Sequence, residues 1–183
     1  MTSPQKQKGS SFERTVAKFL SDTYGEPFVR VPNSGAYVGG NNAHRKKFLD
    51  ESQAKSFKGD ILAPDSWNNF NCECKSYADF PFNLVLAGDC KVLEKWLEQL
   101  TVVAEPNDVN LLCMKFNRKG SFVCVQSKIT WITDQFMYYT SNKLGDWLIM
   151  EFDHFFKYNK DLLKLYSATI DTTSNTKSQQ RPS

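Results

Sequence analysis

Two short apolar segments joined by a turn-rich linker constrain this chain most, because their charged residues all fall on one side. Residues 57–63 and 70–77 are predicted strands, and the six residues between them are dense in turn formers. With a turn centred in that linker, Asp60 lies opposite Glu73 in an antiparallel hairpin, and paired residues project to the same face about 5 Å apart. Lys75 shares that face because side chains alternate along a strand. The pattern predicts two carboxylates and an ammonium group that converge.

This charged face predicts metal-assisted chemistry on a phosphate. Two carboxylates and a backbone carbonyl, here that of Cys74, are the ligands of a hard divalent cation such as Mg²⁺. The ion polarises a phosphoryl oxygen and activates a bound water, while Lys75 orients that water or stabilises the developing negative charge. The alternative is an ordinary solvated strand face, since a Glu-x-Lys pair is a short and common pattern.

The opposite face of the hairpin is apolar and contains Cys72 and Cys74. Free cysteine commonly behaves as a core residue, so we expect both thiols to be buried. The alternative is a zinc site completed by His44 or His154. Five cysteines without C-x-x-C spacing argue against a disulfide framework.

A helix is predicted for residues 10–24, and Glu13 borders its apolar stripe. Glu13 can project toward the hairpin as a third carboxylate. It can equally close a capping box with Ser10, in which its side chain returns to the Ser10 backbone amide. Both interpretations stay open from the sequence. The stripe consists of Phe12, Val16, Phe19 and Leu20.

Four segments in the first eighty residues carry a resemblance to a known family. They are Gly9-x-x-Phe12-Glu13-Arg14, residues 29–35 (VRVPNSG), residues 58–63 (KGDILA) and residues 72–76 (CECKS). Their order and spacing resemble the PD-(D/E)XK nuclease superfamily, and most of all the small Holliday junction resolvases of archaea and phages. Beyond Tyr77 the resemblance is one of element order only.

The resemblance implies a restriction-endonuclease-like α/β core, with a central mixed β-sheet flanked by helices. It implies that Glu13, Asp60 and Glu73 hold Mg²⁺, with Mn²⁺ as a substitute, and that Lys75 serves the nucleophile. Ser34 would lie beside the scissile phosphate. The implied partner is DNA, in the form of four-way junctions, cut by a homodimer to leave 5′-phosphate and 3′-hydroxyl ends.

One departure from the family pattern concerns which aspartate is the ligand. The family's Pro-Asp is Gly59-Asp60 here, while a literal Pro64-Asp65 follows it. Asp65 is eight residues from Glu73, so in a hairpin it would lie at the turn, about 25 Å away along the strand. We therefore assign the role to Asp60. A glycine before it suits a close approach to a ligand or a neighbouring strand.

A basic cluster follows a Gly- and Asn-rich connection in the first half of the chain. Residues 33–42 lead into His44, Arg45, Lys46 and Lys47. A connection of this length is usually functional or disordered, and a cationic segment of this kind suits the DNA backbone. We therefore assign DNA binding to Arg45, Lys46, Lys47 and Ser34. The alternative is a solvated helix over residues 42–57.

The second half reads as regular structure around an aromatic core. Helices are predicted for residues 90–104 and 153–166, and a hairpin for residues 109–116 and 121–126. On the first helix Glu94, with its polar neighbours, is expected to face solvent. The many aromatic residues of 131–166 favour core packing over base stacking or a dimer interface.

Length and composition fit a single enzyme domain. With 183 residues, 40% of them hydrophobic, the chain can bury one sizeable core. We expect one nuclease domain over residues 1–168 and a polar, disordered tail over 169–183. The net charge of +3 does not by itself identify a nucleic-acid partner. We see no membrane span and no signal peptide, so we expect a cytoplasmic protein of a bacterium, an archaeon or a virus-infected cell.

Three alternatives to a junction resolvase stay open. The first is another PD-(D/E)XK nuclease, of restriction type, nicking type or a recombination-linked exonuclease. The second is a non-catalytic DNA-binding protein with the same fold. The third is an unrelated protein in which the charged hairpin is coincidental.

Overall fold

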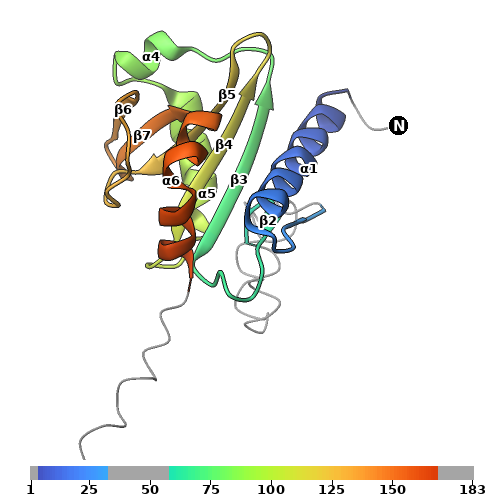
Figure 1. Ribbon diagram of the computed structural model, residues 1–183. Coiled ribbons are helices and arrows are strands. Elements are labelled where there is room, and N and C mark those ends of the chain that lie inside the picture. Colours follow the sequence, from blue (N-terminus) through green and yellow to red (C-terminus); the bar gives the residue numbers. More distant parts are fainter. Residues whose placement is uncertain (1–3, 33–57, 169–183) are drawn as a thin grey trace, which may run out of the picture.

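The computed structural model describes residues 4–32 and 58–168, with side chains from Gly9 onward. Its centre is a five-stranded sheet in the order β3-β4-β5-β7-β6 (Figure 1). β3 and β4 are parallel, and the other neighbours are antiparallel. This mixed sheet with flanking helices confirms the predicted restriction-endonuclease-like fold. The strands are β3 (Phe70–Tyr77), β4 (Val109–Phe116), β5 (Gly120–Gln126), β6 (Met137–Ser141) and β7 (Gly145–Glu151).

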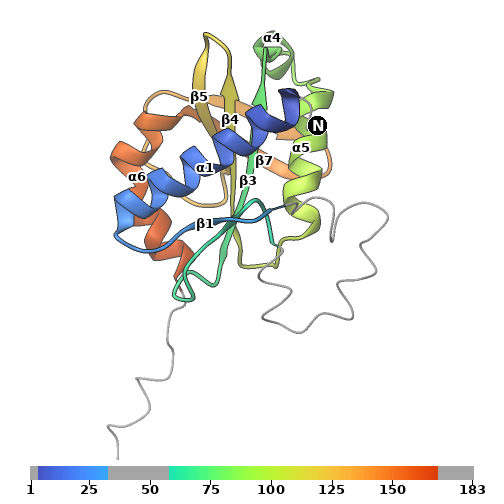
Figure 2. The same ribbon diagram turned by 90° about the vertical axis from the view of Figure 1, so that its right-hand side faces the viewer.

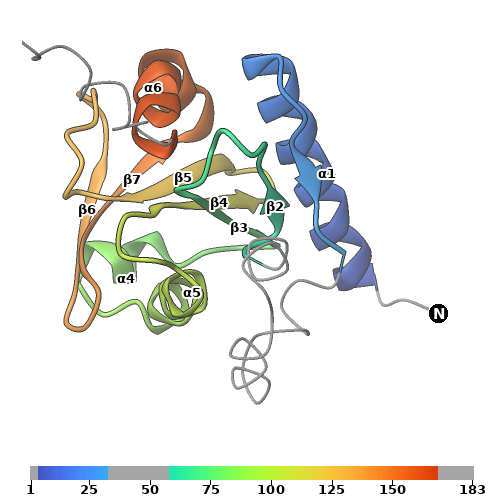
Figure 3. The same cartoon turned by 90° about the horizontal axis from the view of Figure 1, so that it is seen from below.

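Helices cover both faces of the sheet. α5 (Lys91–Val102) lies on one face and α6 (Phe152–Ser167) on the other, while α1 (Pro4–Tyr24) runs along the β3 edge (Figures 2 and 3). The side chains of β4 alternate between two cores because successive residues point to opposite faces. Leu111 and Cys113 pack with α1 and α6, whereas Leu112 and Met114 pack with α5. β4 is therefore the buried centre of the domain.

Most of the elements predicted from periodicity are present. The hairpin of β4 and β5 is confirmed, as are α5 and α6. The apolar stripe of the first helix is buried as predicted, with Val16 and Leu20 at most 1% exposed. Strands β6 and β7 and the short helix α4 (Phe82–Leu86) were not predicted. Aromatic residues of 131–166 divide between the core and the surface, since Trp147 and Phe155 are buried and Phe136 and Tyr138 are half exposed.

The predicted hairpin of residues 57–63 with 70–77 is wrong in its pairing. β2 (Ile61–Leu62) pairs with β1 (Val29–Arg30), and β3 pairs in parallel with β4. The linker is not an exposed two-strand turn, because Trp67 is only 2% exposed and packs edge-on against Phe28. The buried Trp67 side chain therefore packs the linker against the core as a loop. Residues 33–57, just before Lys58, lie outside the described part of the chain.

α1 starts earlier than predicted, and this excludes the capping box. The helix begins at Pro4, so Ser10 lies inside it and cannot be the residue that caps its N-terminus. Glu13 is consequently available for another interaction.

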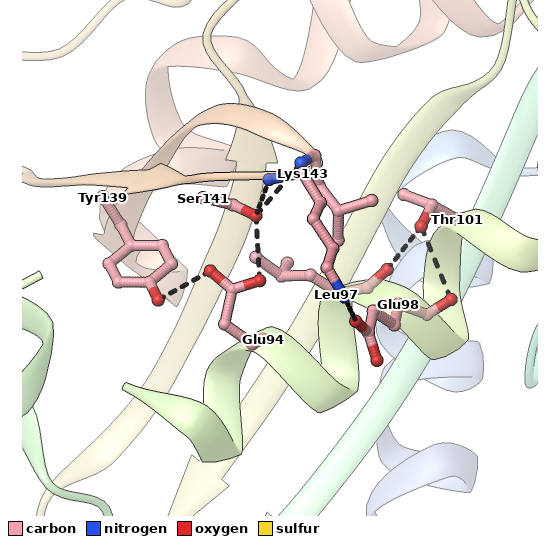
Figure 4. A network of polar contacts seen from close by, with 8 residues as sticks. Glu94, Leu97, Glu98, Thr101, Tyr139, Ser141 and Lys143 are labelled. Carbon is pink, nitrogen blue, oxygen red and sulfur yellow. Dashed lines mark hydrogen bonds and ion pairs between the residues drawn. The ribbon is translucent and has the colours of Figure 1, made fainter. Parts of the chain in front are cut away.

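The prediction that Glu94 faces solvent is wrong. Its side chain forms hydrogen bonds that connect α5 to the outer hairpin of the sheet (Figure 4). Tyr139 donates its hydroxyl to Glu94 Oε1 at 2.8 Å, and Ser141 donates to Glu94 Oε2 at 2.8 Å. Burial and the hydrogen bond to Glu94 raise the pKa of Tyr139 to about 12. Ser141 Oγ also accepts from the Leu144 amide at 3.0 Å. The carboxylate therefore holds the β6–β7 turn against α5, while the neighbouring Lys95 and Gln99 are exposed as predicted.

None of the described helices is long and apolar enough to cross a membrane. The predicted tail lies outside the described residues, so the division into a domain over 1–168 and a tail over 169–183 stays a prediction.

We predict that Gly59 tolerates alanine far less well than Gly88 does. Both have a positive φ, of +70° and +72°, so both substitutions incur the left-handed penalty of about 1–2 kcal/mol. A Cβ at Gly59 would lie 2.3 Å from the Cys72 carbonyl oxygen, whereas a Cβ at Gly88 would meet nothing within 4 Å. Gly59→Ala should therefore lower the free energy of unfolding by about 2 kcal/mol more than Gly88→Ala, measured by urea denaturation. Equal losses in the two variants would contradict the close packing at Gly59.

Candidate active site

Asp60 is attached to the exposed edge of β3 by its backbone and by its side chain. Its amide donates to the Cys72 carbonyl at 2.7 Å, and its Oδ2 accepts from the Cys74 amide at 2.8 Å. Its carbonyl accepts from the Val31 amide at 2.9 Å. Asp60 is only 7% exposed and lies beside Glu73, which stands between those two cysteines. The predicted neighbourhood of the two carboxylates is present, although no hairpin creates it.

Glu73 and Lys75 share one face of β3 and are in contact. Lys75 Nζ donates to Glu73 Oε1 at 2.5 Å, and the two side chains are 14% and 16% exposed. The predicted alternation of β3 places them together, with Cys72 and Cys74 buried on the opposite side. The acid and the ammonium are thus held at the rim of the core rather than in open solvent.

Glu13 of α1 belongs to the same group of charges. It forms an ion pair with Arg30 of β1, whose Nε donates to Glu13 Oε2. The Glu13 side chain is 16% exposed, and its charge is close enough to raise the pKa of Glu73. The structure therefore brings together Glu13, Asp60, Glu73 and Lys75. Arg30 was not predicted as a site residue, although it lies in one of the segments that carry the family resemblance.

The pKa of Glu73 is raised by its burial and by the acids around it. Burial and the neighbouring Asp60 carboxylate raise its pKa from 4.5 to about 7, with Lys75 acting in the opposite direction. Burial of a carboxylate beside a second one opposes ionisation, and a cation between them would remove that opposition. Three carboxylates are also the oxygen ligands that hard divalent cations prefer. The chemistry of the donor set therefore suits a divalent metal ion, but among the described residues the oxygens of Glu13, Asp60 and Glu73 do not all lie within 4.8 Å of one another.

The remaining predicted site residues are elsewhere or outside the described residues. Asp65 is exposed in the loop between β2 and β3, and the hydrogen bond from the Trp67 amide to the Pro64 carbonyl closes a turn around it at 2.9 Å. Among the charges that shift the pKa of Glu73, Asp60 and Glu13 are present and Asp65 is not. Ser34, Arg45, Lys46 and Lys47 lie outside the described residues.

The buried cysteines form a cluster that contains Cys113 and, in the described part of the chain, no histidine. The sulfurs of Cys72, Cys74 and Cys113 lie within 4.8 Å of one another, and those of Cys72 and Cys113 are 3.9 Å apart. His154 instead faces Asp134, with Nε2 and Oδ1 separated by 3.4 Å. A zinc site built from Cys72, Cys74 and His154 is therefore wrong, and His44 lies outside the described residues. The thiols fill the core behind the acidic edge of β3.

The sheet and its edge define the class of protein. A mixed sheet with an Asp, a Glu-x-Lys strand and a helix-borne Glu is the arrangement of the PD-(D/E)XK nucleases. The chain matches the model of the family described as "phage putative PDDEXK endonuclease" over residues 4–165, which is most of its length. The chain therefore belongs to this phage endonuclease family. No curated protein and no solved structure matches it.

Family membership supports a nuclease that acts on nucleic acid, and nucleases of this superfamily typically use divalent metal ions. It contradicts the alternative of an unrelated protein with a coincidental charged hairpin.

We predict that the metal-free protein loses stability as the pH rises through the pKa of Glu73. The folded-state value of about 7 lies above the unfolded value of 4.5, so the folded state binds the proton more tightly. The resulting stabilisation is complete below the unfolded pKa and is lost as the pH rises toward and through the folded pKa. It amounts to about 1–3 kcal/mol.

Glu73→Gln tests this directly because glutamine mimics the protonated acid. In chelator, the variant should melt close to the wild type at about pH 5 and several degrees above it at about pH 8. The measurement is thermal unfolding by circular dichroism at both pH values. A melting difference that is the same at both would contradict the strained ionisation of Glu73.

Proposed function

We propose that this chain is a Mg²⁺-dependent endonuclease that hydrolyses DNA phosphodiester bonds at the site of Glu13, Asp60, Glu73 and Lys75. The observation that carries the proposal is the position of Asp60. Its backbone amide donates to the Cys72 carbonyl and its carboxylate accepts from the Cys74 amide, on either side of Glu73. Lys75 contacts Glu73 from the same strand. An acid, a second acid and a lysine are the groups that such a hydrolysis requires.

The three carboxylates and the Cys74 carbonyl are the proposed ligands. The Cys74 amide points to the strand edge that Asp60 occupies, and the carbonyl of the same residue points to the same side of a strand. The carbonyl therefore points to the strand edge that Asp60 occupies. A divalent ion held there, Mg²⁺ or Mn²⁺ in its place, supplies a Lewis acid for the phosphate and lowers the pKa of a bound water.

Lys75 and Arg30 provide the positive charge of the site. Lys75 Nζ donates a hydrogen bond to Glu73. From this position the ammonium group can orient an attacking water or stabilise negative charge on the phosphate. Arg30 neutralises Glu13 and fixes the direction of its carboxylate. The two cations let three acids stand close together before any metal is bound.

For the substrate we propose a four-way DNA junction, cut by a homodimer that acts in the cytoplasm. The support is the resemblance of the four N-terminal segments to the small Holliday junction resolvases, together with the basic residues Arg45, Lys46 and Lys47. Symmetric nicking of a junction needs two active sites at a fixed separation, hence two copies of the chain. Ser34 would stand beside the scissile phosphate.

Two alternatives are compatible with the same site. The chain can be another nuclease of the superfamily that cuts linear duplex DNA, or a protein that binds DNA without cutting it. An intact set of three acids and a lysine favours cleavage over mere binding.

We predict that Asp60→Asn and Glu73→Gln reduce cleavage to the metal-free background and leave DNA affinity unchanged, because each removes a ligand but no basic surface. Lys75→Ala should lower the rate of cleavage by about a hundredfold. Asp65→Asn is the matched control and should cut like the wild type. The measurements are single-turnover cleavage and gel-shift affinity on the same DNA. A silent Asp60→Asn beside a dead Asp65→Asn would contradict our choice of aspartate.

We predict that an end-labelled four-way junction is nicked in Mg²⁺ and left intact in EDTA, with paired cuts near the branch point. The matching linear duplex is the control and should not be cut. Equal cutting of both would keep the nuclease and reject the preference for junctions. Binding of either DNA without cleavage in any divalent ion would favour the non-catalytic alternative.

A further inference from the structure

Lys58, two residues before Asp60, forms a buried ion pair with Asp108. The two side chains are 11% and 1% exposed. Asp108 lies immediately before β4 and is fixed by its own turn. Its Oδ2 accepts from the Glu105 amide at 2.6 Å, and its amide donates to the Glu105 carbonyl at 3.0 Å. Asp108 is therefore an anchor on the sheet, and Lys58 connects the segment of Asp60 to it.

A buried ion pair contributes little net free energy to the stability of a fold. Desolvation of both charges offsets most of their attraction, and neutral residues of similar size often serve stability as well or better. The pair therefore calls for a role besides stability, and its location suggests one. Gly59 separates Lys58 from Asp60, and its backbone is pressed against the Cys72 carbonyl of β3. The ion pair that fixes the position of Lys58 thus determines how the Asp60 backbone approaches β3.

The Asp60 segment needs such an anchor because little regular structure holds it. β2 begins directly after Asp60 and is two residues long, and it pairs with the equally short β1. Gly59 adds backbone freedom just before the carboxylate. A metal ligand, by contrast, must be held within about 0.5 Å of its working position.

We propose that Lys58 and Asp108 are positioning residues for the metal site. Their ion pair fixes the point at which residues 58–60 meet β3, and thereby the place of the Asp60 carboxylate relative to Glu73. This inference rests on the proposed function, since it assigns the pair to the same metal site. Neither residue touches the reacting atoms.

The test separates positioning from stability with three variants, Lys58→Met, Asp108→Asn and the double variant. Methionine keeps the length and apolar stem of lysine, and asparagine keeps an acceptor for the Glu105 amide. Thermal unfolding gives stability, and the electron paramagnetic resonance signal of free Mn²⁺ gives metal affinity without DNA. Each single variant should melt below the wild type because one buried charge is left unpaired, and the double variant should recover most of that loss.

Metal affinity should behave differently from stability. We expect the Mn²⁺ dissociation constant to rise about tenfold or more in both single variants and to stay raised in the double variant, as for other residues that orient metal ligands. A double variant that recovers both stability and Mn²⁺ affinity would show that the pair is only structural. Wild-type Mn²⁺ affinity in the folded single variants would overturn the proposal equally.

A matched control uses the exposed ion pair of Lys119 and Asp79, whose side chains are 44% and 74% exposed. The double variant Lys119→Met/Asp79→Asn should keep the wild-type Mn²⁺ affinity, and a tenfold loss there would overturn the assignment to Lys58 and Asp108. Failure of the proposed nuclease function can be distinguished from failure of the positioning role. Wild-type protein that binds Mn²⁺ but cuts no DNA contradicts the nuclease alone, whereas wild-type protein that binds no Mn²⁺ contradicts both proposals.

Discussion

The attachment of Asp60 to the edge of β3 is the contact on which the rest of the site depends. β3 is the edge strand of the sheet, so its outer amides and carbonyls would otherwise lack partners. Asp60 uses two of these groups, the Cys72 carbonyl and the Cys74 amide. The same two hydrogen bonds complete the strand edge and place a carboxylate beside Glu73. Gly59 makes the approach possible, because a side chain at that position would collide with the strand.

Electrostatics set the second constraint, since three acids gather at a rim that is largely closed to water. Repulsion and burial are strong enough to raise the pKa of Glu73 to about 7. Lys75 forms an ion pair with Glu73 and Arg30 forms one with Glu13, so each cation offsets the charge of one acid. The site is therefore strained by charge, and a bound cation would relieve that strain. This property follows from the side chains present and does not depend on the identity of the substrate.

The sequence predicted the regular elements whose periodicity is strong. Turn residues located the hairpin of β4 and β5, an apolar stripe located α5, and α6 was also predicted as a helix. It missed β6, where the exposed Tyr138 stands beside the buried Tyr139, and β7, where Trp147 begins an apolar run that does not alternate strictly. The role of Glu94 was also missed, because its partners Tyr139 and Ser141 come from a strand more than forty residues away.

The structure brings Glu13, Asp60, Glu73 and Lys75 together, but not through the predicted hairpin, and their catalytic roles stay a prediction. The hairpin rule brought Asp60 next to Glu73, and they are neighbours, but β3 pairs with β4 instead and a packed loop anchored by Trp67 connects the two segments. A motif constrains which side chains meet more strongly than it constrains the backbone that brings them together. The capping box at Ser10 failed because its premise, a helix starting there, depended on residues without a clear pattern.

The central claim is that Asp60 and Glu73 hold a divalent cation in common. The most direct measurement is the anomalous difference map of a crystal grown with Mn²⁺ and measured near the manganese absorption edge. The account predicts an anomalous peak in contact with the carboxylates of both Asp60 and Glu73. A peak at Asp65 or Asp108 with none between Asp60 and Glu73 would contradict it.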